Sequence, residues 1–257
     1  MAGLQQPVVW AGWESGVNYQ QKFEIGDAVL YQADCAALLP TLGKVSAIIT
    51  DPPYGINAAR TRNSAKDGWV DYGCDGWDLE RPAKEVFDAM LKASYVQVIW
   101  GGNYFADYLP VSQQWLSWDK GQDGFSLADF ELAWSSQDKA CRRINYPRAL
   151  ALKDGKQHPT QKPLAVMRWC IEQAGNPETI LDPFAGSGTT GVAALQMGKR
   201  FIGIEREPKY FEIMCERLRR VVDAPPLFPF ACGKAGKGTA NLQGDLLPLP
   251  SETVERV

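Results

Sequence analysis

Short apolar runs alternate with helix-like patterns along most of this 257-residue chain, and this alternation constrains the fold more than any other feature. An apolar run bounded by turn residues predicts a buried strand, whereas apolar residues three or four apart predict a helix. Strands interleaved with helices predict an α/β fold, in which a mostly parallel sheet is covered on both faces. Seven strands are expected, at 28–33, 45–50, 96–100, 114–118, 129–134, 179–181 and 200–204, with helices at 81–94, 163–174, 189–197 and 211–221.

Composition excludes several classes of protein. The net charge is -3, so any binding of nucleic acid has to come from a local basic patch. No apolar run reaches the length of a membrane-spanning helix, and the N-terminal residues lack the pattern of a secretory signal. The six cysteines are widely spaced and there is one histidine, so no metal site is expected. These features favour a cytoplasmic protein with reduced thiols.

A glycine-rich turn joins an expected strand to an expected helix at residues 181–190, LDPFAGSGTT. Gly186 and Gly188 would let a ligand approach the backbone, and the helix N-terminus favours an anionic group. The strand at 200–204 is followed directly by Glu205, whose carboxylate can accept hydrogen bonds from ribose hydroxyls. The pattern indicates a nucleoside-binding βαβ unit. The absence of a Lys-Ser/Thr pair excludes a P-loop, and the absence of a third glycine disfavours hydride transfer.

A second motif, Asp51-Pro52-Pro53-Tyr54, follows the strand at 45–50. The two prolines fix the backbone and remove two N–H donors, while their carbonyls remain acceptors. Asp51 and the Pro52 carbonyl could each accept one N–H of an amino group, and Tyr54 could stack on the ring that carries it. The motif therefore predicts a site for an aromatic amine.

Together, the DPPY motif and the later DPFAGSGTT resemble the S-adenosylmethionine-dependent amino-methyltransferases of DNA, over roughly residues 27–221. The order of the two motifs resembles the permuted beta group of that family. The resemblance implies a circularly permuted, doubly wound, seven-stranded methyltransferase sheet with one antiparallel strand near its edge. It also implies a flipped target base, because a base inside a duplex cannot reach such a pocket.

The resemblance assigns site residues as well. Catalysis would involve Asp51, Pro52, Pro53 and Tyr54. The segment HPTQKP at 158–163 would close over the methionine part of the cofactor, with Thr160 and Lys162 offering a donor and a cation to its carboxylate. Asp34 would contact the adenine of the cofactor; the alternative is that Asp34 caps a short helix at 35–39. The complete cofactor set is Asp34, Thr160, Lys162, Asp182, Phe184, Gly186, Ser187, Gly188, Thr189, Thr190 and Glu205.

Double-stranded DNA is the expected partner, and a basic segment at 141–157 is the expected contact. It contains Arg142, Arg143, Arg148, Lys153 and Lys156 against a single acid. A solvated basic loop is the alternative. The expected organisation is a peripheral segment at 1–26, a catalytic domain at 27–222 and a flexible tail at 223–257. The sequence leaves open whether the chain forms a homodimer.

Adenine-N6 methylation is the expected reaction, since an Asp before Pro-Pro resembles the motif of the adenine-specific members of the family. Cytosine-N4 methylation has the same geometry and stays open. More distant alternatives are methylation of RNA or of a protein amide, and a silent relative that binds DNA without catalysis. The intact Asp51, Tyr54, Gly186 and Glu205 weigh against the silent relative.

Overall fold

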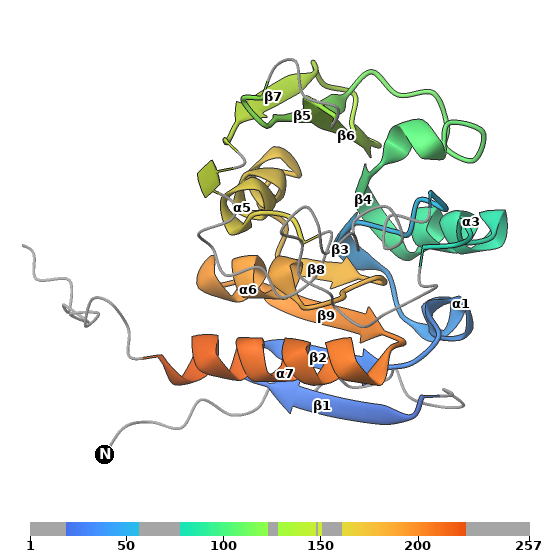
Figure 1. Ribbon diagram of the computed structural model, residues 1–257. Helices are drawn as coiled ribbons and strands as arrows, with labels where there is room; N and C mark the ends of the chain where they lie inside the picture. Colours follow the sequence, from blue (N-terminus) through green and yellow to red (C-terminus); the bar gives the residue numbers. More distant parts are fainter. Residues whose placement is uncertain (1–18, 57–77, 123–127, 148, 151–160, 225–257) are drawn as a thin grey trace, which may run out of the picture. The chain divides into compact units, whose positions relative to one another are not determined.

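The computed structural model describes residues 19–56, 78–122, 128–147, 149–150 and 161–224. Within these residues one sheet of nine strands has the order β1-β2-β9-β8-β3-β4-β6-β5-β7 (Figure 1). All seven strands expected from the sequence are present, and two more extend the sheet at its edges. The bounds are β1 Gln21–Ile25, β2 Ala28–Gln32, β3 Val45–Thr50, β4 Ser94–Trp100, β5 Trp115–Asp119, β6 Phe130–Ser135, β7 Arg142–Asn145, β8 Thr179–Asp182 and β9 Arg200–Glu205.

The centre of the sheet is parallel. β2, β9, β8, β3 and β4 pair with their neighbours in parallel register, so their carboxyl ends share one edge of the sheet. β6 runs antiparallel to both β4 and β5. β1 is a second antiparallel strand, paired with β2, where the sequence predicted only one.

Helices cover both faces of the sheet, as Figure 1 shows. One face carries α5 (Leu164–Gln173), α6 (Thr189–Gln196) and α7 (Pro208–Asp223), which pack on sheet residues such as Leu30 and Phe201. The other face carries α1 (Cys35–Leu38) and α3 (Lys84–Ala93), which pack on alternate residues such as Val29 and Ile202. This period of two along buried strands is what a sheet packed on both faces requires.

Two of the expected segments contain strands that the sequence did not predict. β1 lies within the segment expected to be peripheral, at the edge of the sheet, and only its last residue is buried. β7 lies within the basic segment expected to contact DNA and pairs in parallel with β5, so the start of that segment is a strand and not a loop. Ala83 is the N-cap of α3, and the Asp78 carboxylate accepts a hydrogen bond from the Gly55 amide at 2.8 Å. The tail expected at 223–257 lies outside the described residues beyond residue 224.

In the part of the chain that the structure describes, none of the helices is both long and apolar enough to cross a bilayer. The same residues contain no group of three or more His, Cys, Asp or Glu side chains that could hold a metal ion.

Candidate active site

Acidic residues gather at the edge where the parallel strands end. Asp182 and Glu205 are the last residues of β8 and β9, and Asp51 directly follows β3. In open α/β sheets this edge is where ligands bind, because the loops that leave the strands surround a crevice there. The strand order therefore brings the DPPY motif next to the glycine-rich turn, although more than a hundred residues separate them in the sequence.

The glycine-rich turn is shaped by two residues with left-handed backbone conformation, Gly186 (φ 52°) and Gly188 (φ 79°). Side chains rarely tolerate this conformation, which explains the choice of glycine. A Cβ on Gly186 would meet no atom within 4 Å, so this residue borders open space. The Gly186 amide donates to a carboxylate oxygen of Glu205 at 2.7 Å, and the other oxygen accepts from the Glu207 amide at 2.7 Å. Burial raises the pKa of Glu205 to about 7.

Asp182 joins three elements around the turn. One carboxylate oxygen accepts from the Thr50 hydroxyl of β3 at 2.7 Å and from the Phe184 amide at 3.1 Å. The other accepts from the Thr190 hydroxyl of α6 at 2.6 Å. Asp182 is almost completely buried, and this burial raises its pKa to about 6. Through these hydrogen bonds Asp182 holds β3, the glycine-rich turn and α6 together at the base of the pocket.

One pocket connects the two motifs. Its lining includes Asp51 from the DPPY motif and Lys162 from the segment before α5. From the glycine-rich turn and α6 it includes six residues predicted for the cofactor, namely Asp182, Phe184, Gly186, Ser187, Thr189 and Thr190. The structure therefore brings eight of the predicted site residues to a single pocket.

Asp51 is held from two sides. The Tyr54 hydroxyl donates to Oδ1 of Asp51 at 2.5 Å, and the Lys162 ammonium donates to Oδ2 at 2.5 Å. The Tyr54 ring stacks on Tyr104, with 4.8 Å between centroids and 16° between planes. A Cβ on Gly101 would lie 2.1 Å from this ring, so glycine is needed for Tyr54 to lie where it does.

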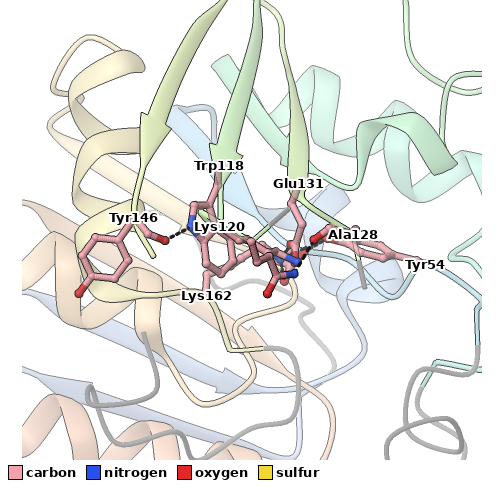
Figure 2. A network of polar contacts seen from close by, with 9 residues as sticks. Tyr54, Trp118, Lys120, Ala128, Glu131, Tyr146 and Lys162 are labelled. Atoms are coloured by element: carbon pink, nitrogen blue, oxygen red, sulfur yellow. Dashed lines mark hydrogen bonds and ion pairs between the residues drawn. The ribbon is translucent and has the colours of Figure 1, made fainter. Parts of the chain in front are cut away.

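Sequence reasoning missed two members of the site, Glu131 and Lys120. Because β6 runs antiparallel to β4, its first residues lie at the edge where the parallel strands end, and Glu131 is the second residue of β6. The Glu131 carboxylate pairs with Lys162 at 3.0 Å and with Lys120 at 2.7 Å. Figure 2 shows these three side chains gathered between Trp118 and Tyr54. The sequence signal that could have indicated Glu131 is a carboxylate within an otherwise mostly apolar strand.

The charged groups of this cluster shift one another's pKa values. Burial raises the pKa of Asp51 by more than Lys162 lowers it. Burial alone would also raise the pKa of Glu131, but Lys162 and Lys120 outweigh that effect and hold it at about 2. For Lys162, burial favours the neutral form, yet the two carboxylates keep its pKa above the ordinary value. The cluster thus contains a charged ammonium between two acids.

Asp34, Arg142 and Arg143 are not among the residues that line this pocket. Asp34 is exposed and its side chain accepts from the Ala36 amide at 2.8 Å, which makes it the N-cap of α1. Arg142 and Arg143 are exposed on the edge strand β7, and Arg143 approaches Asp119 at 3.5 Å. Four predicted residues lie outside the described part of the chain: Thr160, Arg148, Lys153 and Lys156.

Comparison with known proteins identifies the family to which this chain belongs. Residues 99–216 match the DNA methylase family. YubD of Escherichia coli (strain K12), a candidate methylase, is 30% identical over 217 residues, which cover 74% of this chain and 89% of YubD. The type II methyltransferase M2.LlaDCHI of Lactococcus lactis subsp. cremoris is 28% identical over 248 residues, covering 77% of this chain and 91% of the relative.

A solved structure agrees with these relatives. The crystal structure of M1.HpyAVI has a TM-score of 0.50 and 25% identity, and the match covers 74% of this chain and 97% of that one. The motifs, the strand arrangement and these similarities lead to one conclusion: the chain belongs to the N6/N4 DNA methylase family.

Proposed function

We propose that this protein transfers a methyl group from S-adenosylmethionine to the N6 amino group of an adenine flipped out of double-stranded DNA. The observation that carries the proposal is the shared pocket, in which Asp51 of the DPPY motif faces the glycine-rich turn. One half of the pocket suits a nucleoside with an anionic end, and the other suits an aromatic amine.

The residues around the turn fit the methyl donor. Gly186 borders open space, so a ligand can lie against its backbone, and the N-terminus of α6 lies just beyond. Glu205 ends β9 beside this turn, where its carboxylate can accept from the ribose hydroxyls. When bound there, S-adenosylmethionine supplies an activated methyl group on a sulfonium leaving group. The methyl donor is therefore held by the turn, by α6 and by Glu205.

Asp51 acts on the amine. Its Oδ1 and Oδ2 each accept one hydrogen bond from the protein, and each keeps a second acceptor direction for an N–H of the base. Hydrogen bonds from the amine to Asp51 and to the Pro52 carbonyl favour a pyramidal nitrogen and stabilise the positive charge that grows on it. The stacked pair of Tyr54 and Tyr104 offers an aromatic surface for the base.

The strand order supports the circular permutation. The glycine-rich half of the fold, β8-α6-β9, comes last in the sequence but lies between β2 and β3 in the sheet. The catalytic domain is proposed to span residues 27–222. The exposed arginines of β7 support a DNA contact at 141–157, since phosphate binding needs concentrated positive charge.

Cytosine-N4 methylation remains the second candidate, because Asp51 and Tyr54 would treat either exocyclic amine alike. The test is to incubate the protein with labelled S-adenosylmethionine and unmodified DNA, and then to digest the DNA to nucleosides for mass spectrometry. The proposal expects labelled N6-methyladenine. Labelled N4-methylcytosine would select the second candidate, and label found only in parallel RNA or protein samples would refute both.

A further inference from the structure

Lys162 makes contacts that account for its whole hydrogen-bonding capacity. Its ammonium lies 2.5 Å from Asp51 Oδ2, 3.0 Å from Glu131 Oε2 and 3.2 Å from the Tyr54 hydroxyl. A lysine ammonium has three protons, and these three oxygens match them. The Lys162 side chain is 5% exposed, and its nitrogen also lies over the rings of Trp100 and Tyr54, at 5.3 and 5.7 Å from their centroids.

This arrangement differs from the role that the sequence predicted for Lys162. A cation with all its protons directed to the protein has none to offer to a carboxylate of the cofactor. Lys162 lines the pocket, and its ammonium donates to Asp51. The geometry makes Lys162 a partner of the residue that binds the amine.

Glu131 determines where the Lys162 ammonium lies. Its Oε2 contacts Lys162 and its Oε1 contacts Lys120 at 2.7 Å, and the Lys120 side chain is itself only 11% exposed. Lys120 also lies 5.3 Å from the centroid of the Trp118 ring. Neither Glu131 nor Lys120 is among the residues that line the pocket. The contact that joins Glu131 to the pocket is its ion pair with Lys162.

We propose that Glu131 is a positioning residue for methyl transfer: it holds Lys162 against Asp51 and so fixes the carboxylate that receives the amine. The inference rests on the proposed function. With Tyr54 on Oδ1 and Lys162 on Oδ2, the Asp51 carboxylate has one orientation. Without Glu131, the long Lys162 side chain is free to leave Asp51, and a misplacement of about 1 Å can lower a rate about a hundredfold.

The test compares the wild type with Glu131→Gln, Lys162→Gln and the double variant. Methyl transfer to DNA gives kcat and KM, and calorimetry gives the affinity of each protein for S-adenosylmethionine. Glu131→Gln should lower kcat about 10- to 100-fold, while cofactor affinity stays within about twofold because the glycine-rich turn is untouched. Since Glu131 acts through Lys162, the double variant should be no slower than Lys162→Gln.

A pH profile separates positioning from a purely structural role. The groups that act electrostatically on Asp51 are Lys162, Glu131 and Tyr54, with Lys120 behind Glu131. Loss of the Lys162 cation disfavours the charged form of Asp51, so the acid limb of kcat should move to higher pH in Lys162→Gln. If Lys162 leaves Asp51 in Glu131→Gln, the acid limb of that variant should also move to higher pH, whereas loss of the Glu131 charge with Lys162 still in place would move it to lower pH. A variant that only lost folded protein would show a lower rate with its acid limb at the wild-type pH.

The matched control is Asp88→Asn, which removes an exposed carboxylate paired with Lys84 on α3 and should behave as wild type. If Glu131→Gln does not fold, Lys120→Gln tests the same contact from its other side and should lower kcat in the same direction. Wild-type kcat and an unmoved acid limb in Glu131→Gln would overturn this inference but leave the proposed function intact. Additive effects in the double variant would do the same. No transfer by the wild type would overturn the proposed function, and the inference with it.

Discussion

Replacing Asp182 by Asn should make the protein more stable at neutral pH than the wild type, while leaving it similar at pH 4. Burial raises the pKa of Asp182 from 3.8 to about 6. Between these two values the unfolded chain loses the proton and the folded protein keeps it. The free energy of unfolding of the wild type therefore falls as pH rises through this window and becomes level above it. The asparagine does not titrate, so the variant lacks this loss.

The magnitude follows from the size of the shift. A shift of two pKa units corresponds to about 3 kcal/mol at about 1.4 kcal/mol per unit. The amide is close in shape to the carboxyl: its oxygen can accept from Thr50 and the Phe184 amide, and the Thr190 hydroxyl can turn to accept from its nitrogen. Asp182→Ala offers none of these contacts, and each stranded donor should cost about 1–3 kcal/mol.

The assay is urea unfolding, followed by tryptophan fluorescence from pH 4 to pH 8 for the wild type and Asp182→Asn. The difference in unfolding free energy, variant minus wild type, should rise by about 2 to 3 kcal/mol between pH 4 and pH 7. A constant difference, or one that falls with pH, would refute the assignment of Asp182 as a buried carboxylate whose charge the fold disfavours.

Four further predictions concern the pocket and the basic segment. Asp51→Ala should lower methyl transfer about 10²- to 10³-fold with cofactor affinity unchanged, as measured by turnover and calorimetry; wild-type turnover would contradict the role of Asp51. Glu205→Ala should weaken binding of S-adenosylmethionine by about 1–3 kcal/mol. Wild-type affinity should rise as pH increases through about 7, because the charged carboxylate is the better acceptor. Calorimetry across pH tests both, and equal affinities would contradict them. The triple variant of Arg142, Arg143 and Arg148 to Gln should flatten the log–log salt dependence of DNA binding by up to about three units, and parallel slopes would show that these arginines do not contact phosphates.

The central strands could be predicted from the sequence because burial on both faces leaves continuous apolar runs, as in Val45–Thr50. The edge strands lack that signal. β1 has a single buried residue, and three of the four residues of β7 are exposed, so both are defined by backbone pairing with a neighbour. A pattern of side-chain burial cannot reveal a strand that buries little.

The site likewise contains residues that the sequence could predict and residues that it could not. Local motifs predicted Asp51, Gly186 and Glu205, because each acts through the conformation of its own segment. Glu131 could not be found in this manner, since its partner Lys162 lies 31 residues away and meets it only once β6 is placed antiparallel to β4. The same long-range pairing explains why Lys162 was predicted for the cofactor and is found directed at Asp51.

The central claim is that the pocket between Asp51 and the glycine-rich turn methylates adenine in DNA. The most direct measurement is to express the wild type and Asp51→Ala in a host that lacks DNA methylation and to map modified bases in its genome by long-read sequencing. We predict N6-methyladenine at one recurring sequence for the wild type and none for Asp51→Ala. An unmodified genome with the wild type, or equal modification with both proteins, would contradict the account.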